Sequence, residues 1–178
     1  LTLSENIHYD NDAYLMFGKS HKGFEASYYF AKLLSLSTIF YIVTALLLTA
    51  IVNTPALSTY FKHVSTANLY LCPIFIAIFI ASFITMLMFI MPRGMDGILL
   101  TFITSIVLTV ISGLLIPLAF LPEAFITLHN YLPFTSLHSS IVSIAGLQKA
   151  NILAGLIYIC CFIIIGLIML HNKIRKAS

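Results

Sequence analysis

The sequence predicts an all-α membrane protein with four transmembrane helices and a re-entrant or interfacial helical hairpin on the outer face. Of its 178 residues, 60% are hydrophobic and only 8% are charged, whereas about 25% of the residues in a soluble domain are charged. The mean hydropathy is +1.03. Long uncharged stretches separate the few charges, and about 20 apolar residues are enough for a helix to cross a bilayer. Together these observations place the chain in the membrane class.

Four apolar stretches without charge are long enough to be spans. They are expected at residues 33–52, 69–91, 97–120 and 152–170. Residues 1–32 are more polar and are expected to form a cytosolic lead. Residues 171–178 form a short basic tail, so the transmembrane domain is expected to cover residues 33–178.

Residues 121–148 are expected to form a hairpin of two short helices rather than a fifth span. Beyond Glu123 this stretch is uncharged, but it carries two histidines, an asparagine and several serines. Pro122 and Pro133 each stand where a short helix is expected to begin, a position at which proline is tolerated. Within lipid, a proline break is stable only where protein or a water-filled cavity satisfies the freed backbone groups.

The positive charges predict the orientation. Seven Lys and Arg residues lie on the side of both termini, namely Lys19, Lys22, Lys32, Arg93, Lys173, Arg175 and Lys176. Only Lys62 and Lys149 lie on the other side. Because cytoplasmic segments carry the excess of Lys and Arg, we expect a multi-pass protein of the plasma membrane with both termini in the cytoplasm. Tyr28, Tyr29 and Phe30 then suit an aromatic belt at the cytoplasmic interface.

Small residues recur at every fourth position in two of the expected spans. The second span carries Ala77, Ala81 and Thr85, and the third carries Thr101, Ser105, Thr109 and Gly113. Small residues at this spacing allow helix backbones to approach closely, and their hydroxyls can form interhelical hydrogen bonds. The pattern predicts helix contacts within one subunit or, as the alternative, a contact with a second copy.

A series of short motifs follows the third expected span. Ser112-Gly113 is followed by Pro117, then by Leu121-Pro122-Glu123 and then by Leu132-Pro133-Phe134. This order resembles the block after the fifth span of ABC-2 type permeases, the membrane subunits of ATP-driven exporters. In that family the block forms re-entrant helices on the outer face, before a last span and a basic tail. The resemblance implies an outer re-entrant motif that consists of Ser112, Gly113, Pro117, Pro122, Glu123, Pro133 and Phe134.

The N-terminal region carries a second resemblance. The run from Gly18 to Glu25, followed by Ala31-Lys32-Leu33-Leu34, is similar to the cytosolic segment before the third span of ABC-2 permeases. There an amphipathic coupling helix docks on the ATPase. The resemblance implies that the contacts with the ATPase are made by Lys22, Gly23, Phe24 and Glu25. It covers nearly the whole chain, but the family has six spans, so two further spans are expected before residue 1.

No catalytic, cofactor or metal site is expected in this chain. No Asp, Glu, Lys or Arg falls inside an expected span, which argues against proton-coupled transport and against a membrane enzyme. The segment 13–20 loosely matches a phosphate loop, but bulky side chains replace the small ones that such a loop needs. His129 and His138 are expected to be polar residues at a wet interface, with a metal or proton role as the alternative.

The function expected from the resemblance is that of a permease subunit of an ABC exporter. ATP and Mg²⁺ would bind to a separate ATP-binding cassette subunit, and the other partners would be a second permease copy or a paralogue and the lipid bilayer. No nucleic acid is expected as a partner. The alternative is a membrane binding, scaffold or immunity protein without transport activity, and a membrane enzyme ranks third.

Overall fold

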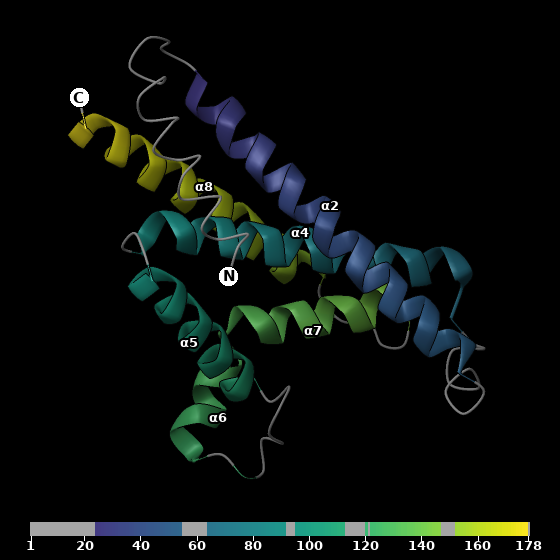
Figure 1. Ribbon diagram of the computed structural model, residues 1–178. Helices are drawn as coiled ribbons and strands as arrows, with labels where there is room; N and C mark the ends of the chain where they lie inside the picture. Colours follow the sequence, from purple (N-terminus) through teal and green to yellow (C-terminus); the bar gives the residue numbers. More distant parts are fainter. Residues whose placement is uncertain are drawn as a thin grey trace.

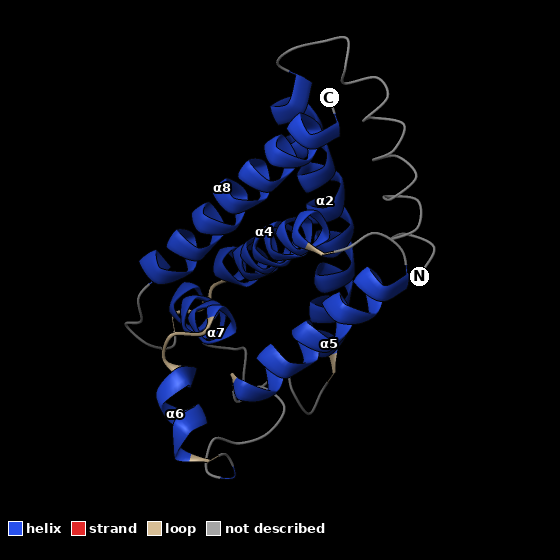
Figure 2. Cartoon of the chain, turned by 90° about the vertical axis from the view of Figure 1, so that its left-hand side faces the viewer, coloured by secondary structure: helices blue, strands red, loops and turns tan. Residues whose placement is uncertain are grey.

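The structure is a computed structural model that describes residues 24–54, 64–91, 95–112, 120, 122–146 and 152–177. All regular secondary structure in these residues is helical (Figure 2), as predicted. The helices are α2 (Phe24–Asn53), α4 (Thr66–Ile90), α5 (Met95–Ile111), α6 (Glu123–His129), α7 (Pro133–Ile144) and α8 (Ile152–Ala177).

Among the described residues, three helices are long and apolar enough to cross a membrane. They are Ala26–Asn53, Ala67–Ile90 and Ile152–Asn172, which correspond to the first, second and fourth expected spans. The third expected span, 97–120, corresponds to α5, whose apolar part Gly97–Ile111 is shorter. Most of the remainder of that expected span lies outside the described residues. The described part of the chain is therefore all-helical, with three helices long and apolar enough to cross a membrane.

Helix α2 is continuous where the sequence predicted a boundary at Lys32. Residues 24–53 contain neither glycine nor proline, so nothing in the backbone interrupts the helical hydrogen bonds. The hydroxyls of Thr38 and Thr49 donate to the carbonyls of Leu34 and Ala45 at 2.8 Å. The described part of the expected cytosolic lead and the expected first span thus form one continuous helix. Similarly, α8 continues through the expected tail to Ala177.

Helix α4 is the central helix of the bundle. It packs against α2, α7 and α8, and Figure 1 shows it passing between them. In the most apolar stretch of α4, 56% of the residues are buried, compared with 6% in that of α2 and 22% in that of α8. A helix that is apolar on all sides belongs in a core or in a membrane. This burial identifies α4 as the core of the described bundle, whereas α2 and α8 leave most of their apolar surface exposed.

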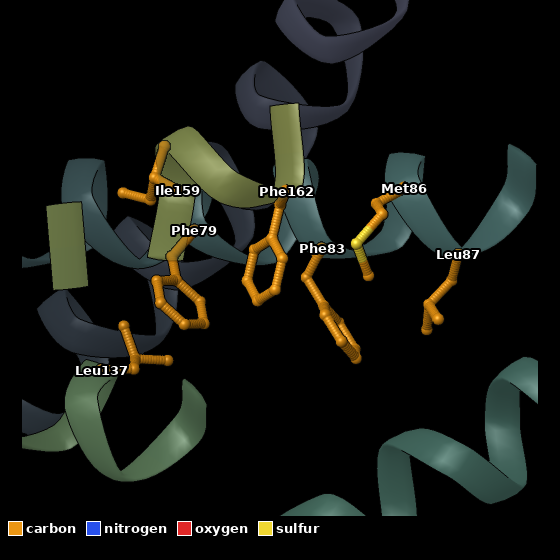
Figure 3. Packing of buried hydrophobic residues seen from close by; sticks show 7 residues of the cluster. All are labelled: Phe79, Phe83, Met86, Leu87, Leu137, Ile159 and Phe162. Carbon is orange, nitrogen blue, oxygen red and sulfur yellow. The ribbon is translucent and has the colours of Figure 1, made fainter. Parts of the chain in front are cut away.

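An aromatic cluster joins α4 to α7 and α8 (Figure 3). Its buried members are Phe79, Phe83, Met86, Leu87, Leu137, Ile159 and Phe162. The rings of Phe79 and Phe162 meet edge to face with their centroids 5.6 Å apart, and Phe134 packs in the same way on Phe83 at 5.3 Å. Such ring pairs contribute about 0.5–1.5 kcal/mol each beyond the area that they bury.

The small-residue stripe of α4 makes contacts within the subunit. Ala77, Ala81 and Thr85 are at most 2% exposed. Among the described residues, these hydroxyls do not form the interhelical bonds that the stripes suggested. Thr85 donates to the carbonyl of Ala81 at 2.6 Å, and Thr101, Ser105 and Thr109 donate to carbonyls of their own helix. A hydroxyl on a helix reaches the carbonyl four residues back without any movement of a second helix, so these residues contribute small size rather than cross-links.

Two glycines of α8 allow neighbouring helices to approach closely. A Cβ atom at Gly155 would lie 2.7 Å from Cζ of Phe75 and closer still to Oγ of Ser140. A Cβ atom at Gly166 would lie 2.8 Å from Cε2 of Tyr29. Both positions are buried on the same side of α8 as Phe162. The two glycines therefore set the distance of α8 from α2, α4 and α7.

The two short helices begin where the prolines predicted. Helix α6 follows Pro122, and α7 has Pro133 at its first turn. They differ in burial, because α6 has no buried residue whereas α7 packs against α4 and α8. Of these two short helices, therefore, α7 packs into the bundle and α6 does not.

Candidate functional site

One candidate site is an apolar cavity of about 590 Å³ between α2, α4 and α7. Its walls include Leu47, Leu48 and Ile51 of α2 and Cys72, Pro73 and Ile76 of α4. Ile141, Val142 and Ala145 of α7 form the third side. This volume is within the range of about 300–1,000 Å³ that is typical of small-molecule sites.

Local backbone features explain why the helices leave space here. Pro73 lies inside α4, and because proline has no N–H it removes the helical hydrogen bond to the carbonyl of Leu69. Helix α7 ends at Ile144, and Gly146, two residues further on, has a φ of 75°, a left-handed conformation that favours glycine. Nδ2 of Asn68 lies 3.9 Å from the point that a Cβ atom would occupy at Gly146. The end of α7 thus closes against the start of α4, beside the cavity.

A second and smaller cavity of about 160 Å³ adjoins the first. The two cavities share the wall residues Leu48 and Leu69. The polar wall groups of the smaller one come from Thr49, Asn53 and Tyr70. The larger cavity is therefore almost entirely apolar, whereas the smaller one, at the end of α2, carries polar groups.

Cys72 is a buried thiol in the wall of the larger cavity. Its Sγ lies 3.9 Å from the carbonyl oxygen of Ile141 in α7, a weak contact that links α4 to α7. Cys160 and Cys161 are exposed on α8. Within the described ranges, no three His, Cys, Asp or Glu residues are grouped closely enough to hold a metal ion.

The structure separates the residues of the predicted outer motif. Phe134 joins the aromatic cluster through Phe79 and Phe83, whereas Pro122 and Glu123 lie on the exposed helix α6. Ser112 is 4% exposed, and its hydroxyl has no hydrogen-bond partner among the described residues. Gly113 and Pro117 lie outside the described residues. The motif is thus divided between a packed half around Pro133 and an exposed half around Pro122.

The predicted coupling residues lie only partly in the described structure. Lys22 and Gly23 fall outside it, and Phe24 and Glu25 form the first turn of α2. Just beyond them, Tyr29 is 0% exposed and stacks on Phe89 of α4 at 5.7 Å. Tyr29 was therefore wrongly assigned to an aromatic belt, because it fills the space that Gly166 leaves open on α8.

Two histidines were considered as candidates for a metal or proton role. His129 is half-buried, and its Nδ1 lies 3.2 Å from Oγ1 of Thr135, so it joins α6 to α7. His138 is exposed. The hydroxyl of Tyr158 on α8 donates to the carbonyl of Tyr131 in the turn between the two short helices. These contacts give the hairpin a structural connection to the bundle that the sequence motifs did not indicate.

Comparisons of the chain with protein-family models, with curated proteins and with solved structures found no match.

Proposed function

We propose that this protein is a permease subunit of an ABC exporter, with four spans, an outer re-entrant hairpin and a separate ATPase partner. The observation that carries the proposal is the placement of α6 and α7. These short helices lie between α5 and α8 in the chain and begin at the prolines of the motif, and α7 packs on two helices of spanning length. This order is the one that the ABC-2 resemblance implies.

The proposed mechanism requires no catalytic residue in this chain. ATP binding to the partner would displace the start of α2, near Phe24 and Glu25. Helix α2 has 30 residues and is therefore about 45 Å long at 1.5 Å per residue. Its last third forms a wall of the apolar cavity. A continuous helix can carry a displacement from the cytosolic end to that cavity as a rigid body.

Contacts at the start of α2 would pass the same displacement to the rest of the bundle. Tyr29 contacts both α4 and α8, through Phe89 and through the carbonyl of Phe162 at 3.5 Å. Because Tyr29 is enclosed on all sides, α2 cannot move at this level without α4 and α8. We therefore expect the three helices to switch together between inward-open and outward-open states, with ATP binding shifting the balance between the two.

The test replaces the aromatic ring of Phe24 by a negative charge and the negative charge of Glu25 by a positive one, at the expected contact with the ATPase. The double variant Phe24→Asp with Glu25→Lys is expected to lose both transport and co-purification of the ATPase. A matched control places the same two new charges at the opposite end of the bundle, as Thr54→Asp with Ser65→Lys, at two exposed positions. The control should retain both properties. If the first variant still transports and still binds the ATPase, the coupling assignment is wrong.

A further inference from the structure

We propose that the two adjoining cavities bind a single-chain amphiphile with an uncharged polar head. The alkyl chain would occupy the cavity of about 590 Å³ and the head group the cavity of about 160 Å³. As a statement about cargo, this inference rests on the proposed exporter function. As a statement about binding, it rests on the cavity walls alone.

The larger cavity suits an alkyl chain because its walls are almost entirely hydrocarbon. They are formed by residues such as Leu47, Ile51, Ile76 and Val142, and no described wall residue carries a charge. A charged group in such a place would be costly, since no wall group could pair with it. A void left empty would lose van der Waals contacts along its lining. A flexible chain of methylene groups restores those contacts.

The smaller cavity suits a head group that both donates and accepts hydrogen bonds without carrying charge. The Asn53 amide can donate and accept, and so can the hydroxyl of Tyr70. The Thr49 hydroxyl donates to the carbonyl of Ala45 at 2.8 Å, which leaves its oxygen available as an acceptor. The described wall of this cavity also has no charged residue. Hydroxyl, amide or sugar groups fit this set of partners.

The relative positions of the two cavities match an amphiphile in a bilayer. Asn53 is the last residue of α2, whereas Thr44, the wall residue of the larger cavity that lies furthest from this helix end along α2, precedes it by about 13.5 Å at 1.5 Å per residue. That depth is less than half of the hydrocarbon thickness of about 30 Å. The head group would therefore lie at the helix ends, and the chain would reach toward the middle of the membrane.

The test is photo-crosslinking of the full chain in phosphatidylcholine nanodiscs. The reagent is a monoacylglycerol with a diazirine at the end of its alkyl chain. Crosslinks are expected near Thr44 and Ile76, and an excess of unlabelled monolauroylglycerol should reduce them at least roughly five-fold. Dodecane, which has no head group, and dodecyltrimethylammonium, which carries charge, should compete weakly. Crosslinks to Leu99 and Phe102, which are 60% and 62% exposed on α5, should not respond to competition and serve as the internal control.

Two variants test the two parts of the site. Val142→Trp fills the larger cavity and should abolish the competed crosslinks, whereas Val107→Trp, at an exposed position on α5, should leave them unchanged. Asn53→Leu removes a polar wall group at an exposed position, so it should fold normally and lose the preference for monolauroylglycerol over dodecane. Size-exclusion chromatography of each variant establishes that it is folded.

Two results would overturn the inference. One is equal competition by monolauroylglycerol, dodecane and dodecyltrimethylammonium in a folded wild-type protein, and the other is an unchanged competed fraction in Asn53→Leu. This experiment requires no ATPase. Absence of competed crosslinks in a chain that co-purifies with its ATPase would reject the amphiphile site and leave the exporter standing, and the reverse pattern would reject the exporter alone.

Discussion

The contact between Gly166 and Tyr29 predicts that Gly166→Ala lowers the stability of the protein while the Tyr29 ring is present and raises it once that ring is removed. In Gly166→Ala, the new Cβ would lie 2.8 Å from Cε2 and 2.9 Å from Cζ of Tyr29, and closer still to its Oη. Cε2 would have to withdraw by roughly 0.6 Å to restore ordinary contact at 3.4 Å, and the hydroxyl oxygen by more. The ring has no space to do so, because Tyr29 is 0% exposed and stacks on Phe89.

The expected magnitude follows from two opposing effects. Overpacking of a well-packed core costs about 1–3 kcal/mol, whereas replacing glycine by alanine inside a helix gains about 1 kcal/mol. The net change is a destabilisation of about 1 kcal/mol. For a chain of this size, that corresponds to a fall in Tm of about 2–4 °C.

The assay is thermal unfolding in detergent, followed by circular dichroism, as a double-mutant cycle. In a Tyr29→Ala background the obstructing ring is absent, so Gly166→Ala should raise Tm by about 2–4 °C through helix propensity alone. The reasoning is refuted if Gly166→Ala raises Tm equally in both backgrounds, since α8 would then not be held by this contact.

Three further predictions test the packing and the hairpin. Phe162→Ala should destabilise the bundle by about 3–5 kcal/mol, because Phe162 is 7% exposed and lies among the aromatic rings; Ile165→Ala, on the exposed side of α8, should cost much less, and similar unfolding temperatures for the two variants would contradict the cluster. In mild detergent, a hydrophobic maleimide should label the exposed Cys160 and Cys161 faster than the buried Cys72, as mass spectrometry can show; equal labelling rates at the three thiols would contradict the burial of Cys72. Tyr158→Phe should remove the hydrogen bond to the carbonyl of Tyr131, at a cost of about 1 kcal/mol, and hydrogen exchange should accelerate in the turn between α6 and α7; unchanged exchange there would show that the turn is held by other contacts.

Features that depend on a few neighbouring residues could be predicted from the sequence. The starts of α6 and α7 follow from the fixed φ of Pro122 and Pro133, which is a local property. The apolar character of the long helices follows from composition. The continuity of α2 could have been predicted in the same way, because residues 24–53 contain no glycine or proline. The boundary at Lys32 came instead from the charge of this residue, which bounds the uncharged stretch.

Features that depend on the relative placement of helices could not be predicted. Tyr29 was expected at the membrane interface. Its burial depends on a contact with Phe162, which is 133 positions away in the chain, so the neighbouring residues do not indicate it. The larger cavity requires three helices at defined distances and the smaller one two, and no single segment carries their pattern. The one usable signal was the pair Gly155 and Gly166, which fall on one side of the last long helix and mark two close helix contacts.

The central claim is that this chain works as the membrane subunit of an ABC exporter. The most direct measurement is quantitative mass spectrometry of the full chain, purified with its native lipids from the membranes in which it normally resides. The account predicts an ATP-binding cassette subunit in a stoichiometric amount, which is lost in Phe24→Asp with Glu25→Lys and retained in Thr54→Asp with Ser65→Lys. A folded, monodisperse protein with no ATP-binding subunit at that level would contradict the account and favour a scaffold or immunity protein.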